Sequence, residues 1–452
     1  MNLGFVIGVL RGRRALRSQE RWSRAEIDSH QATALAALRR HASDRSRFYR
    51  RFHAGYESRP LAELPVLTKG QVVEAFDDLV TDPEVRLTEV REFLSALDGY
   101  RLFRGRYWVA QTSGSTGTPG IFLWSRPEWT TVIASYARAQ EWAGIKADLL
   151  RRTRIGVVSS RIPWHQSALV GMSVDSPFVP VRRFDATSPL EEIVGGLNDW
   201  QPENLICYAS MGRLLAEEQL AGRLRISPRA VMCSSEVLTP ESRQRIHRAF
   251  GVEPFNVYAA TEPAGIAAEC EQHRLHLFED LVITEVVDER NRPVPAGELG
   301  AKVLVTVLFA RTQPLIRYEM SDTIALSEAS CPCGRKFGLL RAVEGRIEDV
   351  LDLPAAHGGK VAIHPNVFHR VLEPLPVRQW QVEQGEDVLT VRIVLGQATV
   401  EPASIGTALA RELKAAGSAS VPIRVEIVAA VAKTALGKAP LIKAADRKEP
   451  EP

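Results

Sequence analysis

Residues 111–120, QTSGSTGTPG, combine glycines with hydroxyl side chains and contain none of the large apolar side chains that build a core. Glycines let a backbone approach an anion closely, and the N–H groups of a turn can form a concave site for it. Four hydroxyls can add donors: Ser113, Ser115, Thr116 and Thr118. The segment predicts a phosphate-binding loop, with a plain surface loop as the alternative. No Gly-Lys-Ser/Thr follows at the required spacing, so a P-loop NTPase is not expected.

Cysteines and histidines form a second group of residues that could do chemistry. CPC supplies Cys331 and Cys333, and the distant segment ECEQHRLH supplies Cys270, His273 and His276. Two thiolates with a short spacer, joined by a further Cys and a His, have the stoichiometry of a closed Cys3His zinc site. We expect structural zinc on Cys270, His276, Cys331 and Cys333, with His273 as the alternative ligand. Reduced cysteines without metal are the other interpretation.

The elements expected around these residues alternate between strand and helix. YWVAQT and IFLW, rich in β-formers, flank the Gly-rich loop. Further along, RIGVVSS, NLICYAS, AVMCSS and FNVYAA are each followed by helical spacing. This alternation predicts a mostly parallel sheet with helices outside it.

The N-terminal region is expected to be helical. LGFVIGVL is too short to span a bilayer, and its basic residues follow it, so it predicts the start of a helix that docks on the body. Ser23 and Glu26 have capping-box spacing, which predicts a helical region over 23–52. LPVLTKGQVVEAF, residues 64–76, is expected to connect into another helix.

The pattern of predicted elements changes in the C-terminal third. LVITEVVDERNRPVPAGELGAKVLVTVL predicts strands joined by a turn, within a β-rich zinc subdomain at about 265–345. After EGRIEDVLDLP, the strands QWQVEQ and VLTVRIVL and the helix SIGTALARELKAAG predict an α+β region. The expected fold class is α/β, with a large multi-subdomain N-terminal domain over 1–346, a hinge at 347–352 and a small domain over 353–452.

Composition excludes several classes of function. A chain of 452 residues is too long for one core, its net charge is only +3, and no basic run is interleaved with aromatics, so no nucleic acid is expected. Without a signal segment or a membrane span, a cytoplasmic location is expected, where the five cysteines are reduced thiols or metal ligands. A homodimer is left open.

Several motifs in fixed order carry a family resemblance. TSGSTGTPG, YAATE (258–262), RYEMSD (317–322), EGRIED (344–349) and KTALGK (433–438) resemble the motif set of the acyl-adenylate-forming ligases. SSEVLTPE, CPCGR and HPNVF resemble its phenylacetate–CoA ligase-like branch. Each motif alone is weak, but their order is specific, and the resemblance covers about residues 35–443. It implies a mobile small domain and also favours the zinc site.

The resemblance implies how a nucleotide is held. ATP would bind with its β- and γ-phosphates on the loop while a substrate carboxylate attacks the α-phosphorus. Tyr258 would stack on adenine, Thr261 would contact the α-phosphate and Glu262 would hold Mg²⁺. Asp322 would accept hydrogen bonds from both ribose hydroxyls, and an ion pair with Arg317 is the structural alternative. The remaining nucleotide-binding residues would be Ser113, Gly114, Ser115, Thr116, Gly117, Ser235, Glu236 and Arg346.

The small domain and the acid pocket are also implied by the resemblance. Lys438 would be the catalytic lysine, bridging the attacking carboxylate and the α-phosphate. Glu348 and Asp349 occupy the hinge, and either could be the pivot. Trp164 and His165 would line or gate the acid pocket, although an aromatic–His pair in a loop also serves packing.

Departures from the family pattern suggest a specialised member in secondary metabolism. Thr118 stands where relatives usually have lysine, Ser321 where glycine is common, and Leu441 where arginine is usual. The leading hypothesis is an aryl acid ligase that passes its acyl group to coenzyme A. In the alternative, an amine, a hydroxyl or another small nucleophile accepts the acyl group. A degenerate, non-enzymatic binder is disfavoured, since it would not need Glu262, Asp322 and Lys438 together.

Overall fold

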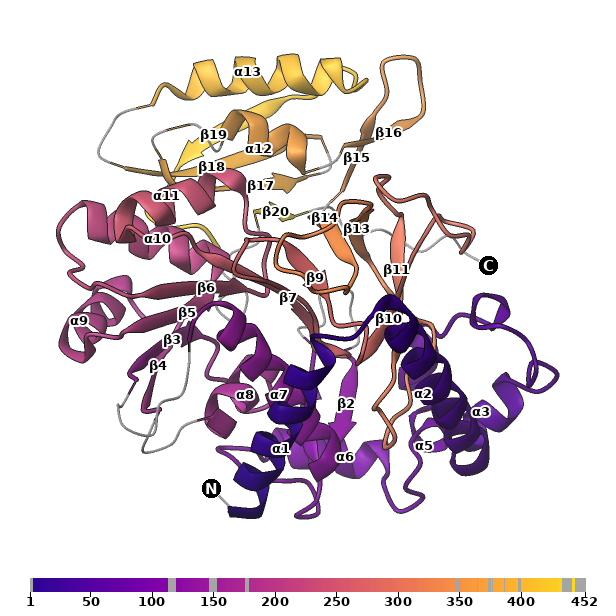
Figure 1. Cartoon of the computed structure of the whole chain (residues 1–452). Coiled ribbons are helices and arrows are strands. Elements are labelled where there is room, and N and C mark those ends of the chain that lie inside the picture. The colour runs from indigo at the N-terminus through magenta and orange to yellow at the C-terminus, as the bar shows by residue number, and fades with distance from the viewer. Residues whose placement is uncertain are drawn as a thin grey trace.

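The computed structural model confirms the predicted α/β class, with a large mixed-sheet body and a small C-terminal sheet. The C-terminal elements lie as a layer over helices of the body, at the top of Figure 1. The structure describes residues 3–112, 119–145, 153–174, 179–346, 350–363, 365–372, 375, 377–385, 387–396, 400–432 and 441–443.

A nine-stranded sheet forms the centre of the body, in the order β13-β14-β9-β8-β7-β6-β5-β3-β4. The four predicted apolar runs form four of its five parallel strands. The side chains of β3 are buried along its whole length, as expected for a strand covered on both faces. The parallel strands are β3 (Ile155–Ser159), β4 (Val181–Asp185), β5 (Asn204–Tyr208), β6 (Ala230–Ser234) and β7 (Phe255–Ala260). The helices between them are α8 (Gln166–Val174), α9 (Leu190–Trp200), α10 (Ala209–Leu220) and α11 (Pro240–Phe250).

The region predicted to be β-rich does consist of strands, but they divide between two sheets. Four of them extend the large sheet: β8 (Ala264–Glu269), β9 (Leu275–Leu277), β13 (Asp322–Ser327) and β14 (Leu339–Arg346). A separate three-stranded sheet contains β10 (Val282–Val287), β11 (Lys302–Val307) and β12 (Tyr318–Met320). β10 and β11 pair antiparallel across the predicted turn. Local sequence predicts strands, whereas the partner of each strand is decided by burial in the whole fold.

The N-terminal helices cover the body. α1 (Leu3–Gln19) packs on α7 (Arg126–Trp142), which confirms the predicted docking. A Cβ added at Gly12 would lie 3.2 Å from the Cβ of Ala134, so glycine lets the two helices approach closely. The Ser23–Glu26 capping box is present, but the helix over 23–52 breaks at Ser46, which caps the next helix. The other elements here are α2 (Arg24–Arg45), α3 (Arg47–Phe52), η1 (Leu61–Glu63), α4 (Lys69–Glu74), α5 (Phe76–Leu79) and α6 (Leu87–Ser95). Among the residues described, no helix has the length and apolar character to cross a membrane.

The C-terminal layer has a core of its own, with Phe368, Trp380 and Leu409 buried at its centre. Its four-stranded sheet has the order β19-β18-β17-β20. The predicted strands and helix are present, and the domain division at 347–352 stays a prediction. The elements are β15 (Leu351–Pro354), β16 (Lys360–Ile363), α12 (Asn366–Leu372), β17 (Val377–Gln384), β18 (Leu389–Leu395), α13 (Pro402–Ala415), β19 (Ile423–Ile427) and β20 (Ile442–Lys443).

Candidate active site

The Gly-rich loop connects two antiparallel strands, as predicted. β1 (Trp108–Gln111) and β2 (Ile121–Trp124) pair with Gln111 opposite Ile121. The N–H of Thr112 donates to the Gly120 carbonyl over 2.9 Å, and the Gly120 N–H donates to Thr112 Oγ1 over 2.8 Å. These bonds join the two ends of the loop to each other.

Several predicted site residues lie outside the part of the chain that the structure describes. The loop residues are Ser113, Gly114, Ser115, Thr116 and Gly117, and the hinge and catalytic residues are Glu348, Asp349 and Lys438. The side chain of Arg346 is likewise not described, although its backbone ends β14 opposite Asp322. Their roles stay predictions.

Three groups of the other predicted residues follow the carboxyl ends of parallel strands. Ser235 and Glu236 follow β6, and Thr261 and Glu262 follow β7. The segment with Trp164 and His165 follows β3. The carboxyl ends of parallel strands meet at one sheet edge, which is where open α/β sheets bind ligands. Motifs far apart in sequence thus come to one edge.

Glu262 and Thr261 are held by residues from other elements. The Tyr318 hydroxyl, on β12, donates to Glu262 Oε1 over 3.3 Å. Gln166 Nε2, on α8, donates to the Thr261 carbonyl over 3.3 Å. Phe122 packs edge-on against the Tyr318 ring, with centroids 6.0 Å apart. Sequence reasoning missed Tyr318 and Gln166; the only signal for Tyr318 was its place inside the RYEMSD motif.

The residues predicted along the adenine have distinct local settings. Ser235 adopts a left-handed backbone conformation, with φ of 67°, which is uncommon for a non-glycine residue and turns the chain sharply after β6. Glu236 Oε2 accepts the Ser210 N–H over 2.8 Å in the first turn of α10. Tyr258 is buried on β7. One carboxylate oxygen of Glu236 therefore stabilises a helix start, and its contact with adenine stays a prediction.

Asp322 begins β13, where it pairs with Arg346 at the end of β14. Arg317, the alternative partner weighed for it, pairs instead with Glu285, with Nε 3.2 Å from Oε2, and also donates to the Leu64 carbonyl. Arg317 therefore joins the three-stranded sheet to the N-terminal region. The ribose role of Asp322 stays a prediction.

The two predicted acid-pocket residues are anchored differently. His165 is buried, and its Nδ1 lies 2.7 Å from Ser167 Oγ, which in turn lies 3.3 Å from the Tyr208 hydroxyl. The Trp164 side chain is half-buried against an apolar cluster beside β1, and its carbonyl accepts the Gln111 N–H over 3.0 Å. This contact joins the segment to the base of the Gly-rich loop.

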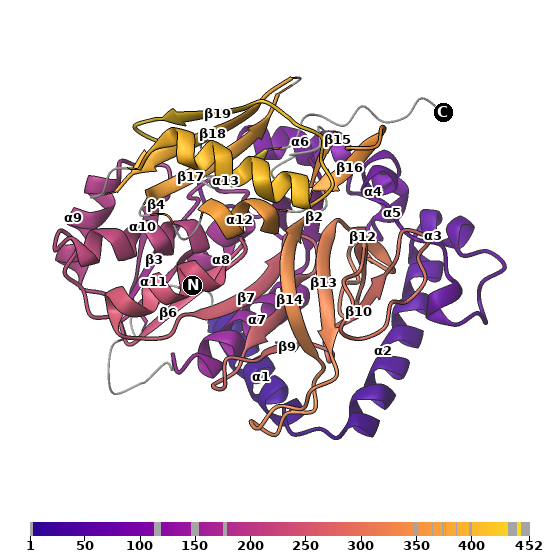
Figure 2. The ribbon, with the colours of Figure 1, turned by 90° about the horizontal axis from the view of Figure 1, so that it is seen from above.

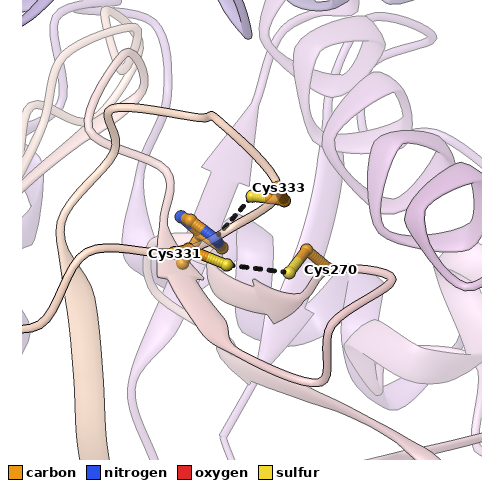
Figure 3. A group of neighbouring side chains, drawn as sticks. Cys270, Cys331 and Cys333 are labelled. Atoms are coloured by element: carbon orange, nitrogen blue, oxygen red, sulfur yellow. Dashed lines mark hydrogen bonds between the residues drawn. The ribbon is translucent and has the colours of Figure 1, made fainter.

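The four predicted zinc ligands come together. The sulfur atoms of Cys270, Cys331 and Cys333 and a ring nitrogen of His276 all lie within 4.8 Å of one another (Figure 3). Cys270 Sγ is 3.7 Å from Cys331 Sγ, and Cys333 Sγ is 3.3 Å from His276 Nε2. A tetrahedral zinc ion would separate two sulfurs by about 3.8 Å and a sulfur from a nitrogen by about 3.6 Å. The donor set and its spacing therefore fit zinc.

Neighbouring groups orient the histidine ligand. His276 Nδ1 lies 3.2 Å from the Phe337 carbonyl, and burial lowers the pKa of His276 to about 4. The neutral ring thus donates from Nδ1 and presents the Nε2 lone pair to the thiols. His273, the alternative ligand, stacks on Phe255 at 4.4 Å between centroids and contacts Glu269 over 3.2 Å.

Comparisons with known proteins agree with the motifs. No family model matches the chain. The chain is 27% identical over 370 residues to phenylacetate-coenzyme A ligase of Thermus thermophilus, covering 78% of this chain and 76% of that protein. It is 24% identical over 296 residues to protein CapK of Staphylococcus aureus, covering 64% of this chain and 59% of the relative.

One protein of the same fold has been solved in several states. Against 2-hydroxyisobutyryl-CoA ligase in its postadenylation state, the TM-score is 0.69 at 20% identity, over 95% of this chain and 92% of that one. Against the thioesterification state of the same protein, the TM-score is 0.58 at 19% identity, over 94% of this chain and 91% of that one. By these similarities, the chain is an acid–CoA ligase-like, AMP-forming enzyme with the fold of the acyl-adenylate-forming ligases.

Proposed function

We propose that this enzyme uses ATP and Mg²⁺ to activate an aryl carboxylic acid and then transfers the acyl group to coenzyme A. A carboxylate oxygen attacks the α-phosphorus, the bond from that phosphorus to the bridging oxygen breaks, and pyrophosphate leaves. The thiol sulfur then attacks the acyl carbon, and AMP leaves. The relative from Thermus thermophilus, a phenylacetate-coenzyme A ligase by name, supports an aryl-substituted acid and coenzyme A as the substrates.

The observation that best supports the proposal is the edge shared by β6 and β7. Thr261 and Glu262 follow one strand and Ser235 follows its neighbour, where an α/β sheet binds its ligand. The Tyr318 hydroxyl also orients the Glu262 carboxylate. Such a carboxylate supplies the hard oxygen that Mg²⁺ prefers.

Other residues take the roles expected from their motifs. The N–H groups of residues 113–117 would hold the terminal phosphates, and Asp322 would accept the ribose hydroxyls. Lys438 would stabilise charge as the acid attacks, since such transfers depend on alignment and charge compensation. The Cys3His group would hold structural zinc, which joins β8 and β9 to the loop between β13 and β14.

A panel of acids tests this proposal. Purified enzyme would be mixed with ATP, Mg²⁺ and each of several aromatic and aliphatic acids, and pyrophosphate release would be followed with and without coenzyme A. We expect acid-dependent release, fastest with aryl acids, and a thioester only when coenzyme A is present. Pyrophosphate release without thioester formation would show that a nucleophile other than coenzyme A accepts the acyl group. No release with any acid would contradict the proposal.

A further inference from the structure

We propose that a polar contact between α10–α11 of the body and the start of β17 holds the C-terminal layer in the placement needed for adenylation. In this proposal, which rests on the proposed function, Arg378 and Glu218 are positioning residues. Figures 1 and 2 show the C-terminal layer lying over α10 and α11 from two directions.

Three arginines make the contact. The Arg378 guanidinium, on β17, forms an ion pair with the Glu218 carboxylate of α10. In the opposite direction, Arg213 Nη2 donates to the Val377 carbonyl over 2.9 Å, and Arg245 Nη1 donates to the same carbonyl over 3.3 Å. Body and layer therefore each supply donors to the other.

A β-bulge makes these groups available. The pairing of β17 with β18 shifts register between Val377 and Gln379, so Arg378 has no cross-strand partner in the ladder. Bulges leave a residue unpaired and redirect its side chain. Here the bulge turns the Val377 carbonyl and the Arg378 side chain toward the body.

Burial and charge hold the body's side of the contact in place. The side chains of Arg213, Arg245 and Glu218 are only 7%, 10% and 5% exposed. Arg213 and Arg245 both pair with Glu241. The pairing with Glu241 lies within the body, so it restrains both guanidinium groups independently of the layer, and less side-chain freedom is lost on contact.

The same strand connects the contact to the predicted catalytic lysine. Farther along β17, the Val382 N–H donates to the Leu441 carbonyl over 2.8 Å, and Val382 pairs with Ile442 of β20. Lys438 precedes this strand by four residues. Anchoring the start of β17 thus also restrains one end of the segment that carries Lys438.

The overall structure is more similar to a relative's postadenylation state than to its thioesterification state. The TM-score is 0.69 against the postadenylation state of 2-hydroxyisobutyryl-CoA ligase and 0.58 against its thioesterification state, at nearly equal coverage. If the layer turns between the two steps, the Arg378–Glu218 pair must break. The pair then favours the first step and contributes nothing to the second.

Charge reversal tests the proposal. Arg378→Glu places a carboxylate against Glu218, and Arg378→Lys keeps the charge. The matched control is Arg392→Glu, because Arg392 on β18 is 29% exposed, against 31% for Arg378, and pairs with Glu383 inside the layer. Each variant would be measured for adenylate formation and for thioester formation from supplied acyl-adenylate.

We expect Arg378→Glu to slow adenylation about tenfold or more, since opposed like charges are costly. Thioester formation should stay within about twofold of wild type, and Arg378→Lys should recover most of the rate. Equal losses in both steps, or the same adenylation rate as Arg392→Glu, would overturn the proposal.

A structural measurement separates this proposal from the proposed function. Small-angle scattering of the ligand-free proteins should show a more extended particle for Arg378→Glu than for wild type or Arg392→Glu. Unchanged scattering would overturn the docking role even if all the enzymes were active. If wild type releases no pyrophosphate with any acid, the proposed function fails, while the scattering still decides whether the contact holds the layer.

Discussion

The hydroxyl of Tyr318 donates a hydrogen bond to Oε1 of Glu262 over 3.3 Å, across 56 positions of sequence. Tyr318 stands on the three-stranded sheet and Glu262 at the end of a strand of the large sheet. The bond therefore ties the orientation of a predicted magnesium ligand to the packing of two sheets.

Tyr318→Phe should weaken the use of Mg²⁺. A hydrogen bond to a charged group contributes about 1.5–3 kcal/mol, and this long one should contribute about 1 kcal/mol. We expect the Mg²⁺ concentration for half-maximal adenylation to rise about fivefold. Tyr49→Phe is the control, because Tyr49 donates to the Pro314 carbonyl in the core. A Mg²⁺ requirement in Tyr318→Phe equal to that of Tyr49→Phe would refute the orienting role.

Asp322→Ala should weaken ATP binding, because one carboxylate would accept both ribose hydroxyls. The expected loss is about 1–3 kcal/mol, measured by calorimetric titration. Glu319→Ala is a nearby control, since Glu319 pairs with Lys302 on the neighbouring strand, with 2.5 Å between the charged atoms. Unchanged affinity in Asp322→Ala would show that the ribose assignment is wrong.

Purified protein should carry about one tightly bound zinc ion per chain. Cys331→Ser or Cys333→Ser should release it and lower the melting temperature. Cys233→Ser provides the contrast, because Cys233 is fully buried on β6, outside the Cys3His group, so this variant should keep its zinc. Protein prepared without chelator and found free of zinc by elemental analysis would exclude the site.

The stability of the protein should fall as the pH drops from about 6.5 to about 4, partly through His53. Burial, with a smaller effect from the charge of Arg39, lowers the pKa of His53 from 6.5 to about 4. Between these values the unfolded chain binds the additional proton, so acid favours unfolding.

His53→Gln should flatten the plot of unfolding free energy against pH by at most about 1.4 kcal/mol per pH unit in that window. His247→Gln, at a position whose side chain is 52% exposed, serves as the comparison. Urea titrations at several pH values measure the slope. Identical slopes for His53→Gln and wild type would rule out this contribution.

The sequence predicted four of the five parallel strands, because each is an apolar run, as in RIGVVSS and AVMCSS. It did not predict β4, whose sequence VRRFD contains two arginines, and β7 leads into strand β8 where helical spacing was expected. It also predicted the four residues of the Cys3His group. It did not predict that β13 and β14 extend the large sheet, since strand partners depend on tertiary contacts. Tyr318 and Arg378 were missed for the same reason, because their partners Glu262 and Glu218 are distant in sequence.

The attack of the carboxylate on the α-phosphorus is tested most directly by isotope transfer. The enzyme would convert an aryl acid labelled with ¹⁸O in both carboxyl oxygens, in the presence of ATP and coenzyme A, and the AMP would be analysed by mass spectrometry. An acyl-adenylate route leaves one labelled oxygen on AMP, because thioester formation breaks the acyl carbon–oxygen bond. We predict one ¹⁸O atom per AMP formed. Unlabelled AMP, or ADP together with labelled phosphate, would contradict the account.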